Sequence, residues 1–91
     1  MSKACKTLVI RNKLGLHARA ATKLAQLTQS FKSEITVQQG EQCVNAASVM
    51  CLMLLASQQG KSVEVCAEGD DAEDALIAVS ELFEDRFEEN E

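Results

Sequence analysis

The spacing of apolar residues along the chain switches between two periods, and each switch marks an expected element. Apolar residues recur every three or four positions from Ala20 to Phe31, which is typical of one face of a helix. Val63, Val65 and Ala67 occupy every second position, as in a half-buried strand. The predicted strands cover residues 4–10, 33–38, 42–44 and 62–67, and the predicted helices cover 18–29, 49–56 and 72–87.

This order of elements, β-α-β-β-α-β-α, predicts one α+β domain over residues 1–91. Such an order usually gives an open-faced β-sandwich, in which three helices cover one face of a four-stranded antiparallel sheet. Ser48 and the segment Gly69-Asp70-Asp71 precede the second and third predicted helices and are expected to cap them. A chain of 91 residues holds only a modest core, which excludes a large catalytic cleft.

The net charge of −5 is unevenly divided along the chain. Up to residue 67 there are eight Lys and Arg side chains and three Glu, whereas beyond it there are one Arg and eleven acidic residues. A mildly basic body suits acidic protein surfaces or phosphorylated small molecules, while the lack of a basic run and the scarcity of aromatic residues argue against nucleic acid. The acidic end is expected to be a solvated helix face and a frayed terminus.

Four cysteines, at positions 5, 43, 51 and 66, form no C-x-x-C pair, so neither a zinc ribbon nor a thioredoxin-like motif is expected and no metal site is predicted. No export signal precedes the first strand, and no apolar run approaches the roughly 20 residues that span a bilayer. We therefore expect a cytoplasmic protein that does not insert into membranes. There the simplest expectation is four reduced thiols acting as small apolar residues, with a disulfide framework as the alternative.

The only histidine, His17, lies where a glycine-containing loop meets the first predicted helix. A helix N-terminus is an anion site, and the amides of Ala18 and Arg19 are expected to point toward a group on the imidazole. Histidine is also a nucleophile in covalent group transfer, and the Arg19 guanidinium matches phosphate oxygens. The sequence thus predicts a transient phosphohistidine. The alternative is that His17 is a helix cap or an ordinary exposed residue.

The segment Gly15-Leu16-His17-Ala18-Arg19-Ala20-Ala21 resembles the active-site motif of the HPr family, the histidine phosphocarriers of bacterial phosphotransferase systems. The resemblance extends over roughly residues 5–87, because the segment 33–37, Ser48 before an apolar helix, and residues 67–69 before an acidic helix follow the family's order. The loop before His17, the Met- and Leu-rich second helix and the acidic tail resemble the nitrogen-related (NPr-like) branch more than the sugar-transport branch.

The resemblance implies a mechanism. His17 would accept a phosphoryl group on Nδ1 from an enzyme I type protein charged from phosphoenolpyruvate, and would pass it to a IIA-type domain. Arg19 would orient the phosphate, and the amide of Ala18 would help to bind it. The resemblance implies no cofactor and no independent enzymatic turnover. A carrier that must expose its site to two partners in turn is expected to be a monomer. Ala20 departs from the family's usual proline, but alanine is the best helix former, so the helix is still expected to start there.

The second predicted helix suggests a docking surface. Its apolar run cannot all face one sheet, so we expect some of the side chains at the following positions to be exposed and to dock partners: Val49, Met50, Met53 and Leu54. The alternative is that the run lies wholly in the core. Ser48 is a candidate site of regulatory phosphorylation by resemblance, although an N-cap role alone explains a serine there. A regulatory interaction protein that docks through residues 48–56 is therefore the alternative function.

Overall fold

The computed structural model describes residues 2–90 and contains one four-stranded sheet. The strands follow the order β1-β4-β2-β3 across the sheet, and all neighbours are antiparallel. The strands are β1 (Ser2–Val9), β2 (Glu34–Gln39), β3 (Gln42–Asn45) and β4 (Ser62–Gly69). The β1 strand thus forms one edge of the sheet, and the β2–β3 hairpin forms the other.

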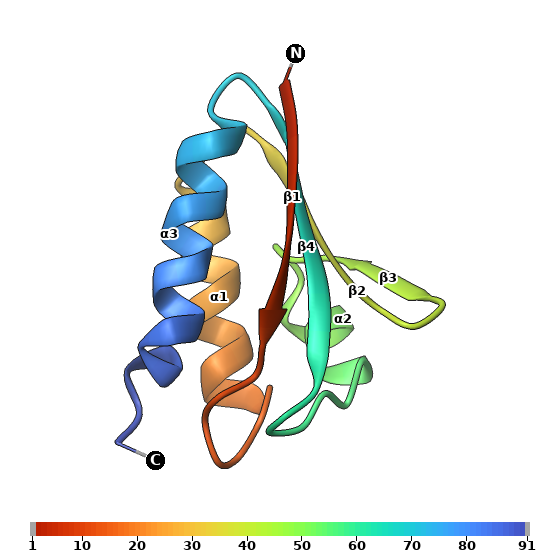
Figure 1. The fold of residues 1–91 in the computed structure, drawn as a ribbon, viewed down its shortest axis with the longest axis vertical. Coiled ribbons are helices and arrows are strands. Elements are labelled where there is room, and N and C mark those ends of the chain that lie inside the picture. The colour runs from red at the N-terminus through yellow and green to blue at the C-terminus, as the bar shows by residue number, and fades with distance from the viewer. Residues whose placement is uncertain (1, 91) are drawn as a thin grey trace.

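Three α-helices cover one face of this sheet, which leaves the other face open (Figure 1). The helices are α1 (Ala18–Gln29), α2 (Val49–Leu54) and α3 (Ala72–Glu84), followed by the short 3₁₀ turn η1 (Arg86–Glu88). α1 and α3 stand side by side in Figure 1, where the chain's C-terminal end and the start of α1 lie at the same end of the molecule. The predicted open-faced sandwich is confirmed.

The core lies between the sheet and the helices, as the two periodicities predict. Val63, Val65 and Ala67 of β4 point to the helices because side chains alternate between the faces of a strand. On α1 the apolar stripe is buried, including Ala20 and Leu24. Because the first turn of α1 is anchored by the buried Ala20, the position of His17, directly before the helix, is fixed.

Two predicted helices are shorter than expected because the backbone turns left-handed after them. α2 ends at Leu54 instead of residue 56, and Ala56 has a φ of +49°. α3 ends at Glu84, and Phe87 lies in a turn with a φ of +54° instead of on the helix. This turn buries the Phe87 ring completely, with its centroid 4.9 Å from that of Phe83. Burial of this apolar ring offsets the cost of ending α3 at Glu84 and turning the backbone.

Asp71 occupies the N-cap position of α3, but its carboxylate does not cap that helix. Instead it accepts hydrogen bonds from the Lys32 N–H at 2.8 Å, the Ser33 N–H at 2.9 Å and the Ser33 hydroxyl at 2.5 Å. The Ser33 hydroxyl and the Lys32 N–H hold the pKa of Asp71 below its usual range. The predicted segment therefore supplies the N-cap residue of α3 but no side-chain capping bond, and the Asp71 carboxylate ties the start of α3 to the chain between α1 and β2.

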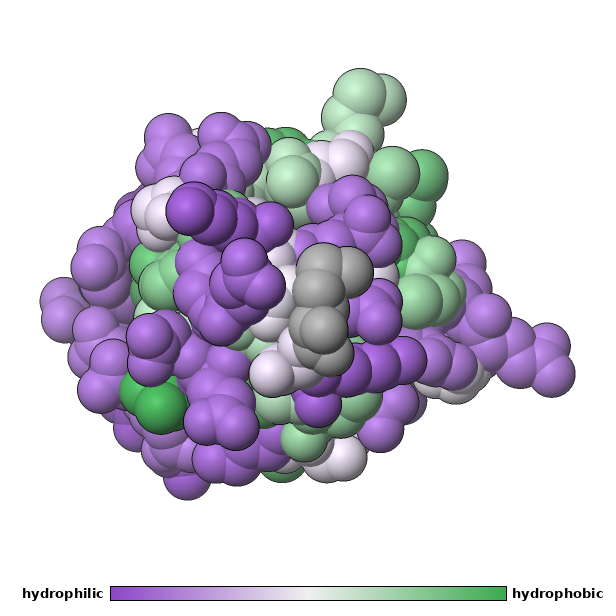
Figure 2. All heavy atoms as spheres, turned by 90° about the horizontal axis from the view of Figure 1, so that it is seen from above, coloured by the Kyte–Doolittle hydropathy of each residue, from purple (hydrophilic) through white to green (hydrophobic). Residues whose placement is uncertain are grey.

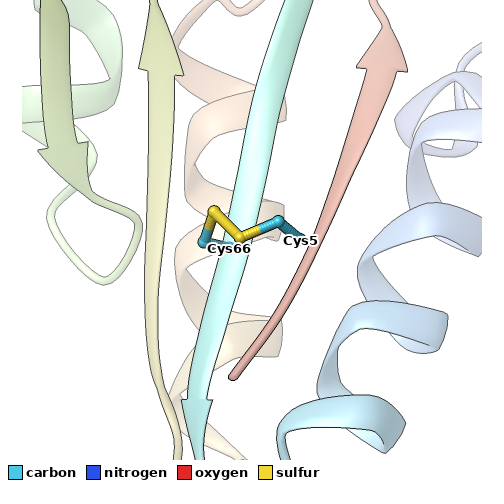
Figure 3. Close-up of a disulfide and its surroundings, with 2 residues drawn as sticks. All are labelled: Cys5 and Cys66. Carbon is cyan, nitrogen blue, oxygen red and sulfur yellow. A yellow bond between two sulfur atoms is a disulfide. The ribbon is translucent and has the colours of Figure 1, made fainter.

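The expectation of four reduced thiols is also wrong, because Cys5 and Cys66 form a disulfide between β1 and β4 (Figure 3). The two residues are direct partners in the strand register, with a Cα–Cα distance of 4.0 Å. They lie 61 positions apart in the sequence, so only the register brings them together. Cys43 and Cys51 are free thiols.

The surface is mostly polar in the view of Figure 2, with apolar side chains gathered mainly toward its upper right. Within residues 2–90, no helix is long and apolar enough to cross a membrane.

Candidate functional site

The loop before α1 is fixed by hydrogen bonds and by one glycine. Gly15 has a φ of +71°, and a Cβ at this position would lie 2.5 Å from the backbone oxygen of Ser57. That oxygen also accepts the Leu16 N–H at 2.9 Å. The fully buried Asn12 donates from Nδ2 to the Gly15 oxygen at 2.6 Å. Only glycine fits this position, and the loop delivers the next residues to α1 in a defined place.

His17 is the N-cap residue of α1, with extended backbone geometry at φ −82° and ψ −178°. The first helical bond runs from the Ala21 N–H to the His17 oxygen at 2.8 Å, so the preceding amides, including those of Ala18 and Arg19, lie outside the helical ladder. The imidazole makes no capping bond of its own and keeps 24% of its side-chain surface exposed. The predicted position at the helix N-terminus is confirmed.

Arg19 lies in the first turn of α1 with its side chain exposed. It borders a cavity of about 360 Å³ between the loop before α1 and the C-terminal tail, the residues that follow α3. The residues that line this cavity are Lys13, Leu14, Arg19, Glu88, Glu89 and Asn90. Basic and acidic groups thus meet beside the histidine, in a hollow large enough to admit a small anion.

The C-terminal tail covers part of the histidine, which overturns the expectation of a frayed acidic end. Glu89 Oε2 contacts His17 Nε2, and Glu89 Oε1 accepts a hydrogen bond from Asn12 Nδ2 at 3.0 Å. Lys23 of α1 donates to the Phe87 oxygen at 3.2 Å and to Glu88 Oε1 at 2.9 Å. The tail is folded because its aromatic residue is buried and its acidic residues have partners on the basic body.

Glu89 lies 72 positions from His17 in the sequence and is not among the predicted site residues. Burial alone would raise the pKa of Glu89, but the hydrogen bonds from Asn12 and His17, together with the charge of Arg19, lower it below its usual range. Glu89 is therefore ionised at neutral pH. The one available signal was Phe87, an aromatic residue inside an acidic run, since such a residue is expected to be buried.

Ser48 caps α2, as predicted. Its hydroxyl accepts a hydrogen bond from the Cys51 N–H at 3.2 Å, and its backbone oxygen accepts the Leu52 N–H at 3.0 Å. A serine cap of this kind stabilises a helix by about 1 kcal/mol. The cap accounts for the serine without a further role, and regulatory phosphorylation of Ser48 stays a prediction.

α2 packs beside α1 and leaves much of its apolar surface exposed. Met50 is 77% exposed, Leu54 71% and Met53 44%, whereas Val49 is half-buried against the core and Leu52 is fully buried. The expectation that part of this run is exposed is confirmed, and the view that it lies wholly in the core is wrong. Docking of partners on this surface stays a prediction.

These features define a class of protein: a small open-faced sandwich that holds a histidine at the N-terminus of a helix and an arginine in the first turn of that helix. The family model described as "PTS HPr component phosphorylation site" matches residues 4–85. The chain belongs to this HPr family, and it is a phosphocarrier of the phosphotransferase system.

Similar proteins carry both of the names used in the family. The chain is 47% identical to the phosphocarrier protein NPr of Shewanella violacea, over 98% of each chain. It is 48% identical to the phosphocarrier protein HPr of Xylella fastidiosa, over 91% of this chain and 93% of that one. Among solved structures, HPr-C-His from Thermoanaerobacter tengcongensis matches with a TM-score of 0.90 and 42% identity over all of both chains.

Proposed function

We propose that His17 is the residue that carries the phosphoryl group and that Nδ1 is the atom that accepts it. The observation that carries this proposal is the place of the imidazole. It stands at the N-terminus of α1, partly exposed, with Nε2 already in contact with Glu89. Nδ1 is then the ring nitrogen left to react. A phosphoryl group on it would lie near a helix N-terminus, which stabilises negative charge.

Arg19 and the amides of Ala18 and Arg19 are proposed to bind the phosphate. The two amides lie outside the helical ladder, and the exposed guanidinium borders the cavity beside the ring. A shallow site of this kind holds phosphate weakly, which suits a carrier that must release the group again.

The exposed side chains of α2 are proposed to dock the partners, together with half-buried Val49. Proteins of this family work with enzyme I and IIA-type proteins, and we assign both kinds of partner to this chain. α2 packs beside α1, so a partner seated on Met50, Met53 and Leu54 would lie near the histidine. The charged rim near α1, which includes Arg19 and Lys23, would favour acidic partner surfaces.

Several further assignments belong to the same proposal. The chain acts as one domain, as a monomer, in the cytoplasm, because a carrier must expose one site to two partners in turn. It has no turnover of its own. The loop before His17, from Asn12 to Gly15, and the acidic tail favour the nitrogen-related branch.

A labelling experiment tests the assignment of His17. The chain is incubated with enzyme I and labelled phosphoenolpyruvate, and the attached phosphate is tested for stability in acid and base. A phosphate that is lost in acid, survives in base and is absent from His17→Ala is expected. A folded wild-type chain that takes up no label from its cognate enzyme I would instead support the interaction protein.

Arg19 is tested against a matched arginine. Arg19→Gln should slow phosphoryl uptake, because it removes the guanidinium beside the cavity. Arg11→Gln removes the same charge from the neighbouring loop, where Arg11 is ion-paired with Glu84 at 2.6 Å, and should leave uptake close to that of the wild type. Equal rates for the two variants would contradict the role given to Arg19.

A further inference from the structure

Glu89 is the one acidic side chain shown in contact with the His17 ring among residues 2–90, and it is well placed to act on that ring. Its side chain is only 12% exposed, and its two oxygens have different partners. Oε2 meets His17 Nε2, and Oε1 accepts the hydrogen bond of the buried Asn12. Each oxygen of the carboxylate therefore has its own partner, and the hydrogen bond from Asn12 fixes the carboxylate against the imidazole.

The rest of the tail holds Glu89 in this place. Phe87 is fully buried against Phe83, and Lys23 binds both the Phe87 oxygen and the Glu88 carboxylate. Asn12 also donates to the Gly15 oxygen, so the same amide joins Glu89 to the loop that delivers His17. The ring and the carboxylate are thus positioned by the same network of contacts.

The chemistry of the contact selects one form of the imidazole. An ionised carboxylate only accepts hydrogen bonds, and the pKa of Glu89 is lowered, so the carboxylate is ionised at neutral pH. The nitrogen that faces it, Nε2, must carry the hydrogen. In the neutral ring Nδ1 then has the free lone pair. A carboxylate that accepts from one ring nitrogen also fixes the orientation of the ring.

We propose that Glu89 is a positioning residue for phosphoryl transfer, which holds the hydrogen of His17 on Nε2 and so makes Nδ1 the nucleophile. This inference rests on the proposed function of His17. In the transfer the Nδ1 lone pair attacks phosphorus, an N–P bond forms, and the bond from phosphorus to the donor breaks with its electron pair left on the donor. The hydrogen stays on Nε2, and the Glu89 carboxylate faces the positive charge that the ring gains.

Two matched variants test this role. Glu89→Gln removes the charge that faces the ring, and Glu84→Gln removes the same charge at the end of α3, where the partner is Arg11. Because His17 is the only histidine, the ¹⁵N spectrum of the ring reports its tautomer without assignment of other residues. The rate of phosphoryl uptake from enzyme I is measured on the same samples.

We expect the wild type and Glu84→Gln to hold the hydrogen on Nε2 and to take up phosphate at similar rates. Glu89→Gln should show an increased share of the Nδ1–H form, and its uptake should be slowed roughly tenfold. The effect is expected to be smaller than the loss of the carboxylate in a buried Ser-His-Asp triad, because the His17 ring is partly exposed. An unchanged tautomer, or uptake by Glu89→Gln as fast as by the wild type, overturns the inference. If the wild type takes up no phosphate, the proposed function fails, while the spectrum still decides whether Glu89 sets the tautomer.

Discussion

Gly15→Ala is the substitution whose cost can be worked out most directly from the structure. A residue with a side chain costs about 1 kcal/mol at a φ of +71°. The new Cβ would also lie 2.5 Å from the Ser57 oxygen, so one of the two must move. Movement weakens the hydrogen bond from the Leu16 N–H to that oxygen, which contributes about 1 kcal/mol. The total expected loss is therefore about 2 kcal/mol.

Gly40→Ala is the matched control. Gly40 also has a positive φ, of +59°, but a Cβ there would meet nothing within 4 Å. Gly40→Ala should therefore lose only the about 1 kcal/mol that the left-handed backbone costs a residue with a side chain. Thermal unfolding followed by circular dichroism at neutral pH should show Gly15→Ala melting roughly 4–8 °C below Gly40→Ala. Equal melting temperatures would refute the argument that Ser57 leaves no room at Gly15.

The remaining predictions concern capping, charge, the disulfide and docking. Ser48→Ala should lower the free energy of unfolding by about 1 kcal/mol, measured by urea denaturation; no loss would contradict the cap. Folding lowers the pKa of Asp71, so the stability that its carboxylate contributes is complete at neutral pH and is lost as the pH falls below about 4. Asp71→Asn should therefore lose less stability than the wild type between neutral pH and acid, as measured by unfolding at a series of pH values. An unchanged dependence on pH would contradict this. Reduction of the disulfide between Cys5 and Cys66 should lower the free energy of unfolding by about 4 kcal/mol. A thiol reagent should detect two thiols in the unfolded protein before reduction and four after it. Four thiols in the untreated protein would contradict the disulfide. Met50→Asp should weaken enzyme I binding in a titration while the melting temperature stays near that of the wild type, and a loss of folding would show that Met50 belongs to the core.

The parts of the fold that depend on local pattern could be predicted from the sequence. α1 appears at its predicted bounds because its apolar stripe has the helical period, and this places His17 at a helix N-terminus. The exposure of Met50 also follows from local pattern, since a helix with apolar residues on all sides cannot bury them all against one sheet.

The parts that depend on distant residues could not be predicted. The turn that buries Phe87 has a left-handed backbone at three residues that are not glycine, namely Arg86, Phe87 and Glu88. The spacing of apolar residues does not predict such a conformation. The contact between His17 and Glu89 exists only once that turn has brought the tail back over α1. The pairing of Cys5 with Cys66 likewise depends on the register of two strands, and spacing along the chain gives no information about register.

The atom that accepts the phosphoryl group, proposed here as Nδ1 of His17, can be observed directly. The chain is labelled with ¹⁵N in its only histidine, phosphorylated by enzyme I and phosphoenolpyruvate, and examined by NMR for the ring nitrogen that is bonded to phosphorus. We predict the N–P bond at Nδ1, with hydrogen on Nε2 facing Glu89. A phosphoryl group on Nε2, or on a residue other than His17, would contradict it.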